Sequence, residues 1–352
     1  MKKIELDLAG ARSEIFIGSG CIADASGIPG RKLVVVDSCV SQIYGKAARQ
    51  LFPDAEFYEF PAGEKSKNPE TVIGLCRFAA QRGFDRQSSF VALGGGVTGD
   101  LTGFAAAVYM RGVKVYQLPT TLLAMVDSSI GGKTGVDIPE GKNLVGAFHQ
   151  PRQVFIDPDF LRTLPAAELR SGLAEAVKSA VILDETLFSR FEELGAALAG
   201  EPDFRNVYPE LIYRVCSIKA RIVAEDEREA GVRALLNYGH TFGHAVETLG
   251  NFTLHHGLAV ALGMTVAARL AVRLGRFSPE AEMRQKHLLE ALGMPTVWPQ
   301  NFAPEAAVEV MKRDKKNRNG EITVVLPRRI GAAEVVRNVP ERELLAAIGE
   351  CR

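Results

Sequence analysis

Hydrophobic and polar positions divide the chain into two halves with different periodicities. In the first half, short runs of apolar and β-branched residues alternate with helix-length segments such as Pro69–Gln81. The runs predicted to be strands are Lys32–Asp37, Phe57–Phe60, Ser89–Leu93, Val113–Leu118 and Val154–Ile156, preceded by an alternating first strand in Met1–Asp7. This alternation is typical of βαβ units, in which crossover helices connect the strands of a parallel sheet.

From Pro165 onward, apolar residues recur three and four positions apart, which predicts a mainly helical second half. The predicted helical segments are Leu169–Ile182, Asn206–Ala224, Arg233–Leu249, Leu258–Leu274 and Ala281–Leu292, with a short β-like run at Glu321–Leu326. A chain of 352 residues has room for two domains. We place their boundary near Leu161–Pro165, so that residues 1–163 form an α/β domain and residues 164–352 a helical one.

Composition limits the classes of protein to which the chain can belong. Its 42 basic and 42 acidic side chains give no net charge that favours nucleic acid or an anionic membrane, and its 47% apolar residues exclude disorder. The N-terminus lacks the apolar core of a signal peptide, and the most apolar later stretch, Leu258–Val272, is too short to span a bilayer. The five cysteines form no CxxC pair, so we expect a soluble, cytoplasmic protein with reduced thiols.

A glycine-rich turn joins one predicted strand to a predicted helix. Ser88–Leu93 runs into GGGVTGD (94–100), and the helical pattern Leu101–Tyr109 follows. Such a turn sets backbone N–H groups and a helix N-terminus against a phosphate, but its spacing is not GxGxxG and a tight structural turn is the alternative. Asp37 ends another strand, where it suits either a ribose hydroxyl or an ordinary helix cap.

Polar residues gather between Pro119 and Pro151, in a stretch predicted to be a loop without a clear element of its own. Its lysines and hydroxyls are donors for phosphate or carboxylate oxygens, and its glycines allow close backbone approach. A loop of this length is usually functional or disordered, and the apolar run Leu144–Phe148 argues against disorder. We therefore expect this loop to bind a ligand.

Four of the six histidines lie between positions 240 and 256. His240 and His244 share one face of a helix, and His255 or His256 can fold back beside them. The set could ligate zinc, or it could consist of stacked, hydrogen-bonded structural histidines, because HTFGH lacks the glutamate of HExxH and names no third ligand.

An acidic ligand could come from Glu175, which lies with Lys178 in a segment of small and apolar residues. A buried charge there needs a metal or a counter-ion, and an intrahelical ion pair with Lys178 is the alternative. Further cations recur at Lys219, Arg233 and the run Lys312–Lys316, where a solvated surface is the ordinary interpretation.

Several long motifs together resemble the 3-dehydroquinate synthase family, a branch of the sugar-phosphate cyclases. They are PAGEKSKN (61–68), GGGVTGDLTGFAAAVYMRG (94–112), LPTTLLAMVDSSIGGKTGVD (118–137), GKNLVGAF (141–148), SGLAEAVK (171–178), ALLNYGHTFGHAVE (234–247) and DKKN (314–317). The resemblance covers most of the chain in the family's order. It implies a nucleotide-binding, Rossmann-like α/β domain followed by a mainly α-helical metal- and substrate-binding domain, with NAD, Zn²⁺ or Co²⁺, and a homodimer.

The resemblance also implies roles for individual residues. Glu175, His240 and His256 would ligate the metal, His256 being selected over His255 because the family motif has histidine directly before glycine, and His244 would be a general acid/base. The residues that fall where the family contacts NAD are Asp37, Glu64, Lys67, Gly95, Gly96, Asp100, Thr120, Thr121 and Asp127, with Lys133 and Lys142 beside them. Those that match substrate-contacting or catalytic positions are Lys133, Lys142, Asn143, Lys178, Lys219, Arg233, Asn237, Lys316 and, across the dimer interface, Arg111.

The implied activity is that of a carbon-oxygen lyase of the shikimate pathway, which leads to chorismate and the aromatic amino acids. It converts 3-deoxy-D-arabino-heptulosonate 7-phosphate to 3-dehydroquinate and phosphate, through transient oxidation by NAD, β-elimination of phosphate, re-reduction and an intramolecular aldol closure. The substrate carries a carboxylate and a phosphate, which a neutral protein must meet with convergent lysines and arginines.

One departure from the family pattern lies beside the expected metal ligands. Leu258 stands where the family motif HGEAVAxGM has glutamate, so a carboxylate that could orient His256 is expected to be missing.

The sequence also leaves three other functions open. These alternatives are a cyclase acting on sedoheptulose 7-phosphate or glucose 6-phosphate, a metal-dependent polyol dehydrogenase, and an inactive NAD-binding regulatory protein. The motifs GGKTGVD and GKNLVGAF favour the heptulosonate substrate.

Overall fold

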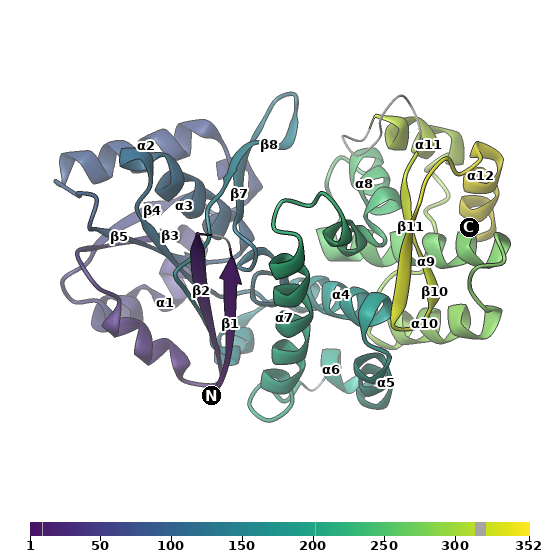
Figure 1. Ribbon diagram of the computed structural model, residues 1–352, viewed down its shortest axis with the longest axis horizontal. Coiled ribbons are helices and arrows are strands. Elements are labelled where there is room, and N and C mark those ends of the chain that lie inside the picture. Colours follow the sequence, from purple (N-terminus) through teal and green to yellow (C-terminus); the bar gives the residue numbers. More distant parts are fainter. Residues whose placement is uncertain (9, 201, 314–321) are drawn as a thin grey trace. The chain divides into compact units, whose positions relative to one another are not determined.

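The computed structural model describes residues 1–8, 10–200, 202–313 and 322–352, which form two compact units (Figure 1). The first unit comprises Met1–Leu164 and Phe204–Arg228, and the second comprises Pro165–Asp203 and Glu229–Arg352. The segment Phe204–Arg228 thus belongs with the first unit, although its helical pattern and position predict membership of the second. The physical reason is apolar packing, because Ala220 and Val223 of this segment bury against Leu6 near the N-terminus.

A seven-stranded sheet forms the centre of the first unit, in the order β1-β2-β9-β6-β5-β3-β4. Its strands are β1 (Lys2–Leu8), β2 (Ala11–Ile17), β3 (Lys32–Asp37), β4 (Glu56–Phe60), β5 (Ser89–Gly94), β6 (Lys114–Pro119) and β9 (Gln153–Ile156). Within this sheet β1 and β2 pair antiparallel, and the other neighbouring strands pair parallel. The residues Leu33–Val36 of β3 are all buried, as expected for a strand covered on both faces. The predicted parallel sheet is confirmed.

Helices cover this sheet and close its core. They are α1 (Ser38–Leu51), α2 (Pro69–Gln81), α3 (Gly96–Val108) and α7 (Tyr208–Glu225). One core cluster joins Leu33 and Val35 of β3, Phe90 of β5, Leu75 of α2 and Leu101 of α3. Alternate residues of the strands therefore pack against residues on one face of each helix, and together they form one apolar layer.

The polar stretch between Pro119 and Pro151 is not a plain loop, and that expectation was wrong. It holds a π-helical turn at Ala124–Ser128 and a hairpin of β7 (Lys133–Ile138) and β8 (Gly141–Phe148). Gly135 and Gly146 face each other across the hairpin, and a Cβ at Gly146 would lie 2.2 Å from the Thr134 carbonyl oxygen. The glycines that made the sequence look like a loop are the residues that let the two strands approach.

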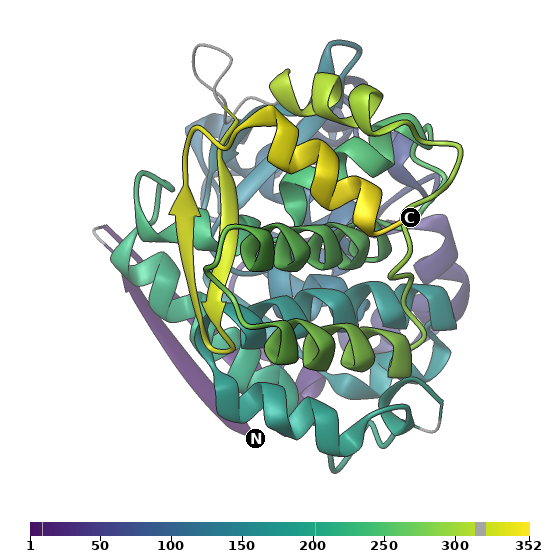
Figure 2. The ribbon, with the colours of Figure 1, turned by 90° about the vertical axis from the view of Figure 1, so that its right-hand side faces the viewer.

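The second unit is mainly helical, as predicted. Its helices are α4 (Ala166–Leu183), α5 (Glu185–Leu194), α6 (Ala197–Gly200), α8 (His240–Leu249), α9 (His256–Arg273), α10 (Pro279–Ala291), α11 (Pro304–Lys312) and α12 (Glu341–Glu350). A two-stranded hairpin of β10 (Val324–Arg329) and β11 (Ala332–Val336) completes it. Figure 2 shows α12 and β10 lying beside α9, which packs against α4, α8 and α10 as well. Within the described residues, no helix is long and apolar enough to cross a membrane.

The segment Arg233–Leu249, predicted as one helix, is interrupted. A 3-10 turn spans Val232–Asn237, and α8 begins only at His240. The interruption falls at Gly239, whose φ of +79° is in the left-handed region that favours glycine. Its effect is to place His240 on the first turn of a new helix.

Candidate functional site

Close helix packing in the second unit brings three chain segments together. A Cβ on Gly257, in the first turn of α9, would lie 2.0 Å from the carbonyl oxygen of Ser171 in α4. A Cβ on Gly263 of α9 would lie 1.9 Å from the carbonyl oxygen of Gly239, just before α8. The Gly257 N–H also donates to Ser171 Oγ at 3.0 Å. Because Ser171 and Glu175 are four residues apart on α4, Glu175 lies on the face that meets the start of α9.

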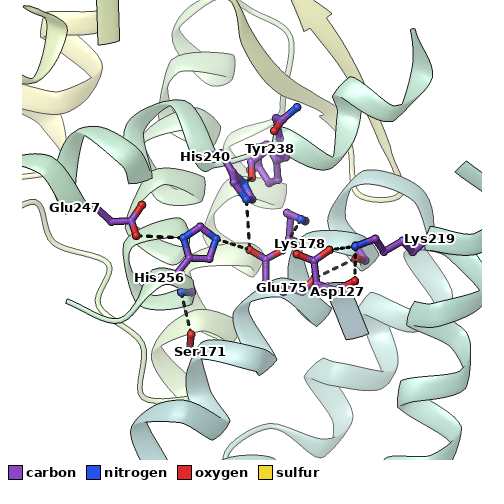
Figure 3. Close-up of polar contacts among 12 residues, drawn as sticks. Asp127, Ser171, Glu175, Lys178, Lys219, Tyr238, His240, Glu247 and His256 are labelled. Atoms are coloured by element: carbon purple, nitrogen blue, oxygen red, sulfur yellow. Dashed lines mark hydrogen bonds and ion pairs between the residues drawn. The ribbon is translucent and has the colours of Figure 1, made fainter. Parts of the chain in front are cut away.

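Glu175, His240 and His256 form a group with the geometry of a metal site. Their ligand atoms all lie within 4.8 Å of one another. Figure 3 shows both imidazole rings facing one carboxylate, with Nε2 of His240 and Nε2 of His256 at 3.6 Å and 3.5 Å from Glu175 Oε1. Two imidazole nitrogens and a carboxylate oxygen are a ligand set that suits Zn²⁺ and related divalent ions.

The electrostatics of this group favour a positive charge at its centre. Burial of Glu175 acts to raise its pKa, but the charge of Lys178 and the hydrogen bond and charge of His256 outweigh it and lower the pKa to about 2. Burial of His256 acts to lower its pKa, but Glu175 and Glu247 outweigh it and raise the pKa to about 10. A cation bound here would replace the positive charge that the two carboxylates hold on His256.

The second nitrogen of each ring has its own acceptor. Nδ1 of His240 lies 3.2 Å from the carbonyl oxygen of Tyr238, and Nδ1 of His256 lies 3.2 Å from Glu247 Oε1 (Figure 3). A carboxylate is therefore present beside His256 despite Leu258, so the expectation that none would be available was wrong. Glu247 was missed in the sequence, where the available signal was a single acidic residue within α8, directly after the apolar pair Ala245 and Val246.

Other predicted site residues of the second unit lie near this group along the chain. Lys178 is buried and pairs with Glu175 one turn earlier on α4. Arg233 is buried in the 3-10 turn, and Asn237 Nδ2 donates to Glu229 Oε1 at 2.5 Å. The ring of His244 lies 5.5 Å from that of His240, centroid to centroid, on the same face of α8.

In the first unit, the glycine turn has the predicted strand–turn–helix form. β5 ends at Gly94, Gly95 is the N-cap, and α3 begins at Gly96. A Cβ on Gly95 would lie 3.1 Å from Thr121 Cγ2, and one on Gly96 would lie 3.2 Å from Ser128 Oγ. The turn thus exposes backbone N–H groups at a helix N-terminus and allows little room for side chains, an arrangement suited to a phosphate.

Asp37 has the ordinary capping contacts that its sequence position allowed. Its Oδ1 accepts from the backbone N–H groups of Cys39 and Val40 at 3.0 Å each, so it caps α1. Its Oδ2 accepts from Thr98 Oγ1 of α3 at 3.2 Å. Asp37 therefore links the ends of two neighbouring strands, β3 and β5, through the helices that follow them.

Lys67 brings together residues that the sequence placed in separate motifs. Its Nζ lies 2.6 Å from Asp100 Oδ2 of α3 and donates to Asn143 Oδ1 of β8 at 2.7 Å. Close by in sequence, Glu64 Oε1 lies 3.8 Å from Lys142 Nζ. The side chains of the motifs GEKSKN and GKN are thus in contact in the first unit.

The remaining predicted residues of this unit are more scattered. Lys219 of α7 pairs with Asp127, which lies in the π-helical turn (Figure 3). Thr120 is buried directly after β6, and Lys133 is exposed at the start of β7. Arg111 is exposed and has a φ of +65°. Lys316, like Lys315, lies outside the described residues.

Comparison with known proteins identifies the family. Models of the N-terminal and C-terminal parts of 3-dehydroquinate synthase match residues 57–171 and 172–317. The 3-dehydroquinate synthase of Nostoc punctiforme is 47% identical over 321 residues, which cover 88% of this chain and 87% of the relative.

Two solved structures extend the comparison to three dimensions. A 2-deoxy-scyllo-inosose synthase, solved with carbaglucose-6-phosphate, NAD⁺ and Co²⁺, superposes with a TM-score of 0.90 at 27% identity and full coverage of both chains. A 2-epi-5-epi-valiolone synthase from Streptomyces hygroscopicus, solved with NAD⁺ and Zn²⁺, has a TM-score of 0.88 at 31% identity, with 100% of this chain and 98% of that one covered. With its α/β unit, its helical unit and both family models matched, the chain belongs to the 3-dehydroquinate synthase family.

Proposed function

We propose that this protein is a 3-dehydroquinate synthase that converts 3-deoxy-D-arabino-heptulosonate 7-phosphate to 3-dehydroquinate and phosphate. The observation that carries the proposal is the convergence of Glu175, His240 and His256 in a chain that is 47% identical to a curated enzyme of that name. The reaction belongs to the shikimate pathway, which supplies chorismate and the aromatic amino acids. We place the protein in the cytoplasm, in keeping with its scattered, unpaired cysteines.

The cofactors proposed are NAD and one divalent ion, Zn²⁺ or Co²⁺. When bound, NAD takes up and returns a hydride while the metal acidifies a secondary alcohol, so that phosphate elimination and ring closure proceed without net redox change. Glu175, His240 and His256 fit the metal, since they supply one carboxylate and two imidazoles whose ligand atoms lie within 4.8 Å.

The NAD site is assigned to the first unit. The glycine turn at Gly95 and Gly96 supplies backbone N–H groups for a pyrophosphate, and Asp37 supplies a carboxylate at the end of a neighbouring strand. The other residues assigned to this site are Glu64, Lys67, Asp100, Thr120, Thr121 and Asp127, with Lys133 and Lys142 beside them.

The anionic substrate requires cations, and this chain offers them in both units. Those assigned to its carboxylate and phosphate are Lys133, Lys142, Lys178, Lys219, Arg233 and Lys316, with Asn143 and Asn237 as amide donors. Lys178, Lys219 and Lys142 pair with Glu175, Asp127 and Glu64. Binding of the substrate therefore exchanges protein carboxylates for substrate oxygens around these ammonium groups.

His244 is proposed to move a proton. It is half-buried, lies on the same helix face as His240 and is not part of the group assigned to the metal, and an imidazole can both donate and accept a proton.

A homodimer is proposed as the working assembly. Exposed apolar side chains occur in the first unit at Val108, Met110, Leu144, Val145 and Phe148. Val108 and Met110 lie directly before Arg111, the residue assigned to a contact across the interface. A face that buries such side chains favours self-association.

The second candidate function is a related cyclase acting on sedoheptulose 7-phosphate, favoured by the structural likeness to the valiolone synthase. The higher identity to curated 3-dehydroquinate synthases favours the heptulosonate, which also carries a carboxylate that needs donors. A polyol dehydrogenase of similar build would accumulate NADH.

The deciding experiment incubates the purified protein with the heptulosonate phosphate, a trace of NAD and zinc. We expect phosphate release in molar excess over NAD, with 3-dehydroquinate identified by NMR. No turnover, or turnover of sedoheptulose 7-phosphate alone, would refute the proposal. Steady accumulation of NADH absorbance with a simple polyol would identify a dehydrogenase.

A further inference from the structure

We infer that Glu247 is a positioning residue, which accepts the Nδ1–H of His256 and so directs the Nε2 lone pair of His256 toward the metal. The inference rests on the proposed metal site, but it does not depend on the substrate or the reaction. It goes beyond the three ligands by naming what fixes the tautomer of one of them.

The two nitrogens of the His256 ring face two different carboxylates. Nδ1 lies 3.2 Å from Glu247 Oε1, and Nε2 lies 3.5 Å from Glu175 Oε1. A neutral imidazole carries one proton and one lone pair, so a proton held at Nδ1 leaves the lone pair at Nε2. The acceptor at Nδ1 therefore decides which nitrogen is available to a metal.

Glu247 is placed where a carboxylate needs a partner. It is 7% exposed and lies in the last turn of α8, next to the buried Val246. A buried carboxylate costs free energy unless it is paired, and His256 is a partner that the structure provides. The first turn of α9 offers no acidic side chain of its own, so the carboxylate at Nδ1 of His256 comes from the neighbouring helix.

His240 and His256 differ in the kind of group that faces Nδ1 of the ring. Nδ1 of His240 has a neutral carbonyl acceptor, Tyr238 O, at 3.2 Å. The side chain of Tyr238 is itself fixed, because its hydroxyl donates to Gln285 Oε1 at 2.8 Å. A charged acceptor makes an imidazole more basic than a neutral one does, so His256 becomes the stronger donor to the metal.

The geometry also allows a competing arrangement that the experiment must separate. The ligand atoms of His244, Glu247 and His256 lie within 4.8 Å of one another and could hold an ion themselves. Two ions held at once would require both nitrogens of His256 as ligands, and hence loss of its last ring proton. If Glu247 only positions His256, the ring keeps its Nδ1 proton, and the chain binds a single ion.

The test compares Glu247→Gln with Glu168→Gln in the full-length protein. Glu168 is a matched control, because its Oε1 lies 3.1 Å from Nδ1 of His255, the exposed histidine next to His256. Zinc affinity and stoichiometry are measured by competition with a chelator. We expect one zinc per chain throughout, a dissociation constant raised about 10–100-fold in Glu247→Gln, and a change below about twofold in Glu168→Gln.

A second measurement distinguishes positioning from a merely structural role. Nitrogen-15 NMR of labelled histidine in the zinc-loaded protein should show His256 protonated at Nδ1, with that signal shifted in Glu247→Gln and unchanged in Glu168→Gln. If Glu247→Gln does not fold, Glu247→Asp takes its place and should weaken zinc binding by a smaller factor.

Three results would overturn the inference: zinc binding by folded Glu247→Gln within twofold of the unsubstituted protein, a His256 ring protonated at Nε2, or a second zinc that only the Glu247 variant loses. Failure of the proposed function is a separate result. Absence of turnover with the heptulosonate phosphate would leave the zinc titration and the NMR measurement fully interpretable.

Discussion

At the residue scale, the proposed metal site depends on a few side chains whose neighbours restrict their conformations. Glu175 is 1% exposed and has Lys178 one turn away on the same helix. His240 is oriented through the Tyr238 carbonyl, and His256 is oriented through Glu247. Each proposed ligand thus has a second contact that restrains its side chain, which is how proteins fix the geometry of a metal site.

Removal of one imidazole tests the ligand set directly. His240→Ala should lose bound zinc and activity together, because two protein ligands hold the ion far less tightly than three. Metal content by mass spectrometry and phosphate release measure the two effects. His255→Ala is the matched control, since His255 is exposed and its Nδ1 pairs with Glu168 instead of facing Glu175. Full activity with metal retained in His240→Ala would remove His240 from the ligand set.

At the element scale, close packing of α9 against its neighbours brings the three proposed metal ligands together. Glycines at both contacts, Gly257 against α4 and Gly263 against the turn before α8, allow backbone to meet backbone. That approach sets the first residue of α9, His256, beside Glu175 of α4 and His240 of α8. The geometry of the proposed metal site therefore depends directly on the close packing of helices in the second unit.

A methyl group added at Gly263 should disturb both the packing of α9 and the geometry of the proposed metal site. Gly263→Ala would place Cβ 1.9 Å from Gly239 O, and relief of that overlap would force the turn before His240 to move. We expect a loss of about 3 kcal/mol in the free energy of unfolding, measured with urea, and weaker zinc binding. Gly349→Ala in α12 is the control, because a Cβ added there would have no heavy atom within 4 Å. Equal stability of the two variants would contradict this account of the packing.

The same elements show what the sequence could and could not predict. β3 and α2 have strong local patterns and were predicted at their observed bounds. The β7–β8 hairpin was missed because its pairing depends on glycines that locally favour turns. The packing of α7 with the first unit was not predicted, because helical periodicity does not say which sheet a helix packs on. Glu175 could be linked with the histidines only through the family motif, since its closeness to them is a tertiary contact.

At the scale of the whole molecule, acidic and basic residues are equal in number, and several of them also form ion pairs within the proposed ligand sites. Lys67 pairs with Asp100, Lys178 with Glu175, and Lys219 with Asp127, so several cations assigned to anionic ligands have protein carboxylates as partners. Cations and carboxylates are thus paired within the proposed sites as well. An anionic ligand must compete with these carboxylates, which favours substrates that carry more than one negative group.

The division into two units assigns the two proposed cofactors to residues of different units. The residues assigned to the metal all belong to the second unit, and those assigned to NAD all belong to the first. Because a ligand stabilises the structure to which it binds, zinc should slow amide hydrogen exchange mainly in α4, α8 and α9, and NAD mainly in β3, α3 and β6. At a ligand concentration of about 100 times Kd the stabilisation is about 2.7 kcal/mol, or roughly 100-fold slower exchange through opening of the bound region. Hydrogen exchange followed by mass spectrometry resolves these segments.

Protection by zinc confined to the first unit, or protection by NAD confined to the second, would reverse the assignment. Glu175→Gln should abolish the protection by zinc while leaving the protection by NAD in place.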